Sequence, residues 1–72
     1  MAKGPYNYSK LLGRLREKGI TQEELARKIG LNPSTLNIKL KSKSDFSQTE
    51  IRMICEVLGI PLEEIPAYFF VR

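Results

Sequence analysis

The sequence of 72 residues contains no histidine, and its only cysteine is Cys55. One cysteine cannot form an internal disulfide, and without histidine the usual cysteine and histidine ligands of a zinc site cannot be assembled from one chain. The sequence also lacks a nucleophile elbow, a phosphate-cradling loop and a pair of carboxylates in an apolar setting. We therefore expect no enzymatic activity, no metal, no cofactor and no small-molecule ligand.

Long apolar runs are missing as well. No segment approaches the ~20 apolar residues of a membrane span, and the start MAKGPYNYSK lacks the apolar region of a signal peptide. The chain is about half as long as a typical domain of roughly 150 residues. These features predict one cytoplasmic domain over residues 1–72, away from membranes, with a flexible start at 1–6 and an apolar C-terminal tail at 66–72.

Positive charge is concentrated in the first part of the chain. Lysine and arginine outnumber aspartate and glutamate by 12 to 8, and residues 1–46 alone hold ten basic and four acidic residues. Between Arg27 and Lys43 there are five basic residues and no acidic one. Such a segment favours a polyanionic partner, although taken alone it is equally typical of a solvated basic surface.

Helix start signals occur three times in the sequence. Thr21 and Ser47 each begin a capping box that is completed by a glutamate three residues later, and Asn32 precedes Pro33 at a first helical position. No segment shows the alternation of a strand. The pattern predicts an all-α fold with helices at 8–18, 22–29, 33–41 and 48–58, and a short helical turn at 60–65 that Pro66 ends.

The second and third predicted helices are joined by only three residues, 30–32. Gly30 can take the positive φ that a tight turn requires, and Ala26 is small enough for two short helices to cross closely. This is the pattern of a helix-turn-helix. The segment QEELARKIGLNPSTL at 22–36 resembles the lambda-repressor/Cro-like DNA-binding domains, also called the xenobiotic response element family, and residues 8–58 match the five-helix order of that family.

Residues from 34 to 46, with 50–51 and 58–61, are similar to small phage or prophage Cro-type regulators. The sequence departs from many members at Lys39, where an apolar residue is common. The core-facing pair of the third predicted helix must then be Leu36 and Leu40, which are spaced i, i+4. Opposite them, positions 34, 37, 38 and 41 form one outward stripe.

An outward stripe on this helix would meet base edges in a DNA major groove. From it we predict base contacts by Ser34, Asn37 and Ile38. The exposed isoleucine could pack on a thymine methyl, although it could also be an ordinary surface residue. The resemblance implies flanking contacts to the DNA backbone, and we assign these to Gln22, Thr35, Lys39, Lys41, Lys43 and Ser44.

The end of the chain is strongly apolar. Its large side chains can pack in the core of the monomer or form a twofold interface, and the resemblance implies dimerisation through this region. We expect partial core packing and a weak homodimer. The candidate interface residues are Met53, Val57, Tyr68, Phe69, Phe70 and Val71. Cys55 lies on the apolar stripe of the helix at 48–58, so we expect an inert core residue.

The resemblance implies a transcriptional regulator of repressor type that binds a twofold symmetric double-stranded DNA operator. Two other classes stay open at this point. The chain could be the antitoxin of a toxin–antitoxin pair, with the aromatic tail binding a toxin, or a protein-interaction module built on a helix-turn-helix scaffold.

Overall fold

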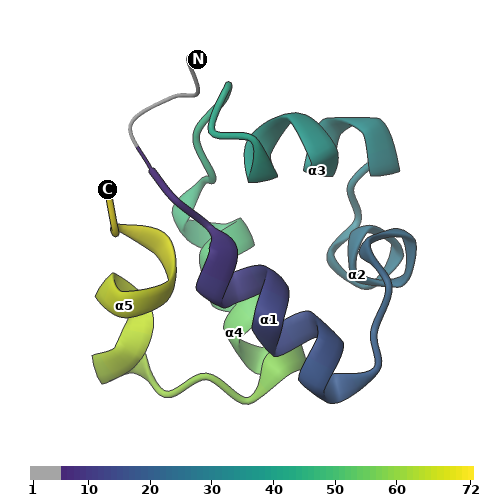
Figure 1. Ribbon diagram of the computed structural model, residues 1–72. Helices are drawn as coiled ribbons and strands as arrows, with labels where there is room; N and C mark the ends of the chain where they lie inside the picture. Colours follow the sequence, from purple (N-terminus) through teal and green to yellow (C-terminus); the bar gives the residue numbers. More distant parts are fainter. Residues whose placement is uncertain (1–5) are drawn as a thin grey trace.

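All regular secondary structure in the described part of the chain is helical. The computed structural model describes residues 6–72, and within them there is no strand. No helix of this described part is long and apolar enough to cross a membrane. The helices in Figure 1 are α1 (Ser9–Lys18), α2 (Gln22–Ile29), α3 (Pro33–Leu40), α4 (Gln48–Leu58), a 3-10 turn η1 (Leu62–Glu64) and α5 (Ile65–Phe69). The predicted all-α, five-helix class is confirmed, and the four longer helices agree with their predicted bounds to within one residue.

Local chemistry sets the helix ends. The hydroxyls of Thr21 and Ser47 accept hydrogen bonds from the backbone N–H of Glu24 and Glu50, at 3.0 and 3.1 Å. The two glutamates accept in return from the N–H groups of their caps, each at 2.9 Å. Both predicted capping boxes are therefore present, and they satisfy backbone donors that have no partner within the helix. At the other end of α2, Gly30 has φ 77°, the left-handed conformation that the short turn needs.

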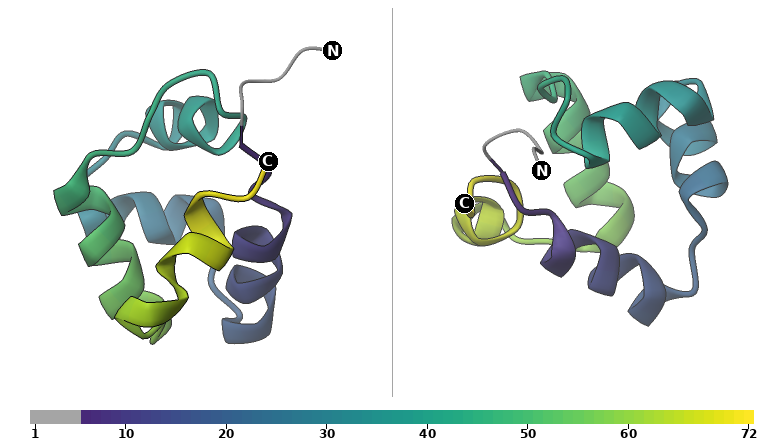
Figure 2. Two further views of the ribbon diagram at one scale, coloured as in Figure 1. Left: turned by 90° about the vertical axis from the view of Figure 1, so that its left-hand side faces the viewer. Right: turned by 45° about the horizontal axis from the view of Figure 1, so that its top comes forward.

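The helices enclose a single apolar core. α2 packs against α3 and α4, while α1 packs against α4 and α5, so α1 and α4 lie between the helix-turn-helix and the C-terminal helix (Figures 1 and 2). Cys55 is buried there as predicted, and burial raises the pKa of its thiol, which keeps it protonated. The other buried side chains are Tyr8, Leu11, Leu15, Leu25, Ala26, Ile29, Leu36, Leu40, Ile54, Leu58, Ile60, Tyr68 and Phe69.

The C-terminal helix differs from the sequence prediction. Pro66 does not end a helical turn; it occupies the second position of α5. A proline is tolerated there because the N–H that it lacks would have no partner in the first turn. The helix carries Tyr68 and Phe69 into the core, where they are 6% and 1% exposed.

The burial of these two aromatic residues corrects the predicted dimer interface. Tyr68 and Phe69 pack in the core of their own chain, so they are not available to a second copy. Phe70 and Val71 are 49% and 42% exposed, and Met53 and Val57 on α4 are half-buried. Only these four remain candidates for an interface.

The two ends of the described chain lie side by side (Figure 1). The N–H of Asn7 donates to the carbonyl of Val71 at 2.6 Å, and the ring of Tyr6 meets that of Phe70 edge to face, with centroids 5.7 Å apart. Most of the predicted flexible start, residues 1–5, lies outside the described residues. Its last residue, Tyr6, is held in place by these contacts.

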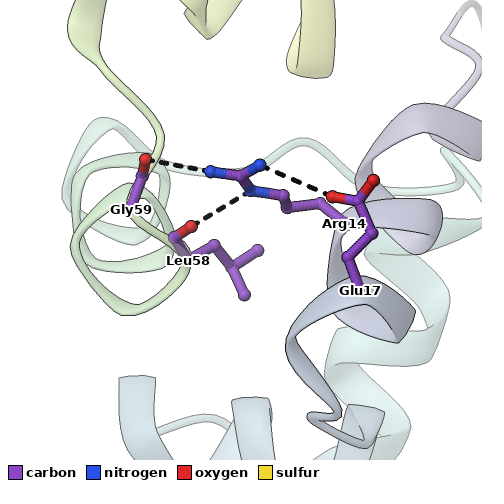
Figure 3. Close-up of polar contacts among 4 residues, drawn as sticks. All are labelled: Arg14, Glu17, Leu58 and Gly59. Carbon is purple, nitrogen blue, oxygen red and sulfur yellow. Dashed lines mark hydrogen bonds and ion pairs between the residues drawn. The ribbon is translucent and has the colours of Figure 1, made fainter.

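One arginine joins the first and fourth helices (Figure 3). The side chain of Arg14 donates from Nε to the carbonyl of Leu58 at 3.1 Å and from Nη2 to the carbonyl of Gly59 at 3.2 Å. Its Nη1 lies 3.5 Å from the carboxylate of Glu17. Arg14 thus supplies donors, and a positive charge, to carbonyls at the C-terminal end of α4 that lack partners within the helix.

Candidate nucleic-acid interface

The position of α3 depends on the packing of α2 beneath it. Leu25 and Ala26 of α2 are fully buried, and the absence of a large side chain at Ala26 allows the two helices to approach closely. The side chain of Asn32 accepts from the N–H of Ser34 at 2.9 Å, and Pro33 follows it as the first residue of α3. These contacts fix where α3 begins and which side it turns to the core.

The buried face of α3 is the one predicted from the sequence. Leu36 and Leu40 are 0% and 8% exposed, whereas Ile38 is 45% exposed. Ser34 and Lys41 are also exposed, and Asn37 is half-buried. The outward stripe therefore exists as a structural feature, while the base contacts assigned to its residues stay predictions.

Two of the predicted base-contacting residues have partners within the protein. The Asn37 amide lies at 3.5 Å from the side-chain oxygen of Gln22, so the candidate base contact on α3 stands beside the candidate phosphate contact at the start of α2. The hydroxyl of Ser34 donates to the side-chain oxygen of Asn32 at 2.6 Å. That hydroxyl still has lone pairs with which it can accept a hydrogen bond.

Lys39 differs from the other predicted phosphate contacts. Its Nζ lies 3.1 Å from the carboxylate of Glu50 on α4 and donates to the backbone carbonyl of Asp45 at 2.8 Å. Only 13% of its side chain is exposed. The charge of Lys39 is therefore balanced inside the protein, and we leave this residue out of the proposed set of DNA contacts.

The partner of Lys39 has a lowered pKa. Burial raises the pKa of Glu50, but hydrogen bonds from the Ser47 backbone and from Lys39, together with the charge of Lys39, outweigh burial and lower it. Glu50 therefore stays ionised and completes two interactions at once, the capping box of α4 and the ion pair to α3. The sequence showed only the first of these.

The loop after α3 contains a residue that the sequence analysis missed. Ser42 has φ 61°, and it is buried with its hydroxyl accepting from the N–H of Tyr6 at 3.1 Å. The N–H groups of Ser42 and Lys43 donate back to carbonyls of α3, at 2.9 and 3.1 Å. Glycine or asparagine usually takes this left-handed position, so a serine there gives no sequence signal.

This loop determines where the remaining cations lie. The other predicted backbone contacts are all exposed, at Gln22, Thr35, Lys41, Lys43 and Ser44. Since the one cation within α3 is neutralised, the exposed cations nearest to α3 in the sequence are Lys41 and Lys43 after the helix and Arg27 and Lys28 on α2. Within residues 6–72, no group of three side chains is arranged to hold a metal ion.

Comparisons with known proteins agree with the helical architecture. The family model described as "Protein of unknown function (DUF739)" matches residues 4–72. A similar solved structure is the solution structure of the modulator of repression (MOR) of the temperate bacteriophage TP901-1 from Lactococcus lactis. It is 39% identical, with a TM-score of 0.77, over 92% of this chain and 89% of that one. No curated protein matches the chain.

Proposed function

We propose, since this chain belongs to the family described as "Protein of unknown function (DUF739)", that it is a phage-type transcriptional regulator whose α3 contacts a specific double-stranded DNA operator. The observation that carries the proposal is the orientation of α3. Its two leucines are buried, and a stripe of small polar and aliphatic side chains faces away from the core. The second helix of a helix-turn-helix can fit into a DNA major groove when its polar side faces away from the core in this way.

Each residue of the stripe has a chemistry suited to base edges. The Asn37 amide can pair with N6 and N7 of adenine, and Ile38 can pack on a thymine methyl group. Ser34 offers an acceptor, because its proton is donated to Asn32. Sequence selection therefore rests on Ser34, Asn37 and Ile38.

Contacts to the DNA backbone hold the helix in register without reading sequence. We assign them to Gln22 and Thr35 on the helices, and to Lys41, Lys43 and Ser44 in and beside the loop. With Lys39 neutralised, two lysines remain to release counterions, which corresponds to a slope of about −1.8 in log K against log salt for each monomer.

The proposal includes a weak homodimer. Each chain forms one DNA-binding domain over residues 1–72, without catalysis or a cofactor. Two half-sites require recognition helices about 34 Å apart on one side of a dimer. The contact would use the four predicted interface residues that lie at or near the surface, which are Met53, Val57, Phe70 and Val71.

The decisive experiment is selection of binding sites from random duplexes. We expect a twofold symmetric consensus, and we expect the double variant Asn37→Ala/Ile38→Ala to lose it. The matched control is Leu62→Ala, which removes a side chain that is 71% exposed on η1 and away from α3. Absence of any enriched sequence at low salt would refute operator binding.

A second candidate function is modulation of a repressor through protein contact. The observations that favour it are the neutralised cation in α3, the exposed Ile38 and the similarity to a phage modulator of repression. In that case the wild-type chain would not bind duplex DNA at low salt. It would instead form a complex with a phage repressor, and substitution of Ile38 would weaken that complex.

A further inference from the structure

A second surface, outside the helix-turn-helix, contains an aromatic pocket of about 200 Å³. It lies between the N-terminal segment, the start of α4 and the end of α5. The proposed DNA contacts include none of its residues. Five aromatic side chains line it: Tyr6, Tyr8, Phe46, Phe69 and Phe70.

The aromatic rings of this pocket form a connected network. Tyr8 and Phe69 are buried and each meets Phe46 nearly at right angles, at 87° and 88°, with centroids 5.4 and 5.7 Å apart. Tyr6 and Phe70 meet each other at 81° and are more exposed. The hydrogen bond from Asn7 to Val71 holds these two segments together. The pocket is therefore lined by aromatic side chains that pack on one another, and the faces of such rings carry partial negative charge.

An acidic side chain stands among these rings. Asp45 lines the same pocket and is exposed, and among residues 6–72 no ion pair includes its carboxylate. The nearby Lys39 binds the backbone carbonyl of Asp45 and is neutralised by Glu50. Burial raises the pKa of Tyr8, and the negative charge of Asp45 raises that pKa further. The carboxylate is therefore close enough to interact electrostatically with an aromatic residue that lines the pocket.

We propose that this pocket binds an arginine side chain presented by a protein partner. A guanidinium group can lie against the aromatic rings while it donates to the carboxylate of Asp45, and the side-chain oxygen of Gln48, also in the lining, can accept a further hydrogen bond. Arginine is preferred to lysine because its planar, weakly hydrated group stacks on rings and donates in two directions. A nucleic acid fits this pocket less well, because its anionic phosphates would be repelled by the carboxylate of Asp45. The inference does not depend on DNA binding by α3.

The test is a titration of the isotope-labelled protein with blocked arginine, followed by amide and aromatic NMR shifts. We expect saturable shifts confined to the pocket, above all at Tyr6, Asp45 and Phe70, with a dissociation constant in the millimolar range. Blocked citrulline has the same shape without the charge and should produce no saturable shift. Blocked lysine should bind several-fold more weakly.

Two variants and one control make the result specific. Asp45→Asn and Tyr6→Leu should each weaken blocked arginine about fivefold or more, as expected for the loss of a charge partner or a cation–π contact. Glu63→Gln removes the same charge from η1, outside the pocket, and should leave the affinity unchanged. Shifts spread over the whole surface, equal binding of citrulline or lysine, or an unchanged affinity in both pocket variants would overturn the proposal.

Discussion

Single residues on α3 and in the loop after it differ in what they can contribute to DNA binding. Asn37 carries a donor and an acceptor on one amide and stands on the outward stripe, where a base edge would lie. Lys43 carries a point charge on a flexible stem and is exposed in the loop. An amide can discriminate between bases, whereas an ammonium responds to any phosphate. Their substitutions should therefore have different signatures.

Asn37→Ala should flatten the base preference at one operator position. The expected loss of discrimination is about 1 to 3 kcal/mol, because one bidentate contact to adenine disappears. Binding-site selection with the variant measures it, and circular dichroism should show an intact fold. Thr49→Ala, an exposed polar position on α4, serves as the control. A preference that stays as sharp as in the wild type would exclude Asn37 from base reading.

Lys43→Ala should weaken binding to all duplexes about equally. It should also reduce the magnitude of the salt slope by about 0.9 per monomer, because one phosphate contact no longer releases a counterion. Titrations at several salt concentrations measure both effects. Arg52→Ala, which removes a charge from an exposed position on α4, should leave the salt slope unchanged. A loss restricted to particular base pairs would contradict the assignment of Lys43.

Lys39 shows the limit of reading residues one at a time. The sequence placed it in a basic segment and suggested a phosphate contact. The structure turns it toward α4, where Glu50 is the nearest anion at 3.1 Å. No pattern within α3 could show this, because the partner is eleven residues away and belongs to another helix.

Among whole elements, the junction of α3 and α4 has the most specific chemistry. Glu50 completes the capping box of α4 and also holds Lys39, so one carboxylate joins the start of one helix to the middle of another. Its lowered pKa means that this contribution to stability is present above the ordinary glutamate value of 4.5. The contribution is lost as the pH falls through the lower pKa of the folded state.

Glu50→Gln tests this junction without removing the cap, because glutamine also completes a capping box. We expect a loss of about 1 to 3 kcal/mol of unfolding free energy near neutral pH, as for a hydrogen bond to a charged group. The difference from wild type should shrink as the pH is lowered, since the wild-type carboxylate becomes protonated. Urea unfolding at about pH 7 and about pH 3 measures it.

The matched control for this junction is Glu56→Gln, which removes an exposed charge further along α4. It should change stability little at either pH. If the Glu50→Gln difference were the same size at both pH values, the ion pair with Lys39 would not be the source of the effect.

At the scale of the whole molecule, Arg14 connects parts of the chain that are distant in sequence. It reaches from α1 to the last carbonyls of α4, which are the negative end of that helix (Figure 3). α4 packs against α2, and α2 packs against α3. The orientation of α4 therefore affects the position of α3. The contact is therefore a structural support for the interface rather than a part of it.

Arg14→Met should lower the unfolding free energy by about 1 to 2 kcal/mol, because methionine keeps the apolar stem but supplies no donor to the two carbonyls. Urea unfolding followed by circular dichroism measures the change. Arg16→Met removes the same charge from an exposed position of α1 and should have a smaller effect. Equal losses in the two variants would mean that net charge, and not the contact to α4, is responsible.

The sequence by itself determined the four longer helices, their ends and the inward face of α3, but not the C-terminal helix α5. Capping boxes at Thr21 and Ser47, the turn at Gly30 and the spacing of Leu36 and Leu40 are local, since each depends on residues within about one turn of helix. That locality is why the predicted bounds of these four helices agree with the structure and why the short turn between α2 and α3 is visible in the sequence.

Only the tertiary structure decided which charged side chains are paired and which residues of the C-terminal segment are buried. The pairing of Lys39 with Glu50, the reach of Arg14 to α4, the left-handed Ser42 and the burial of Tyr68 and Phe69 all depend on segments that meet in space. The energy of such contacts is set by distance and burial between side chains far apart in the chain, which no periodicity records. The aromatic pocket beside Asp45 is of the same kind, because its walls come from both ends of the described chain and from the start of α4.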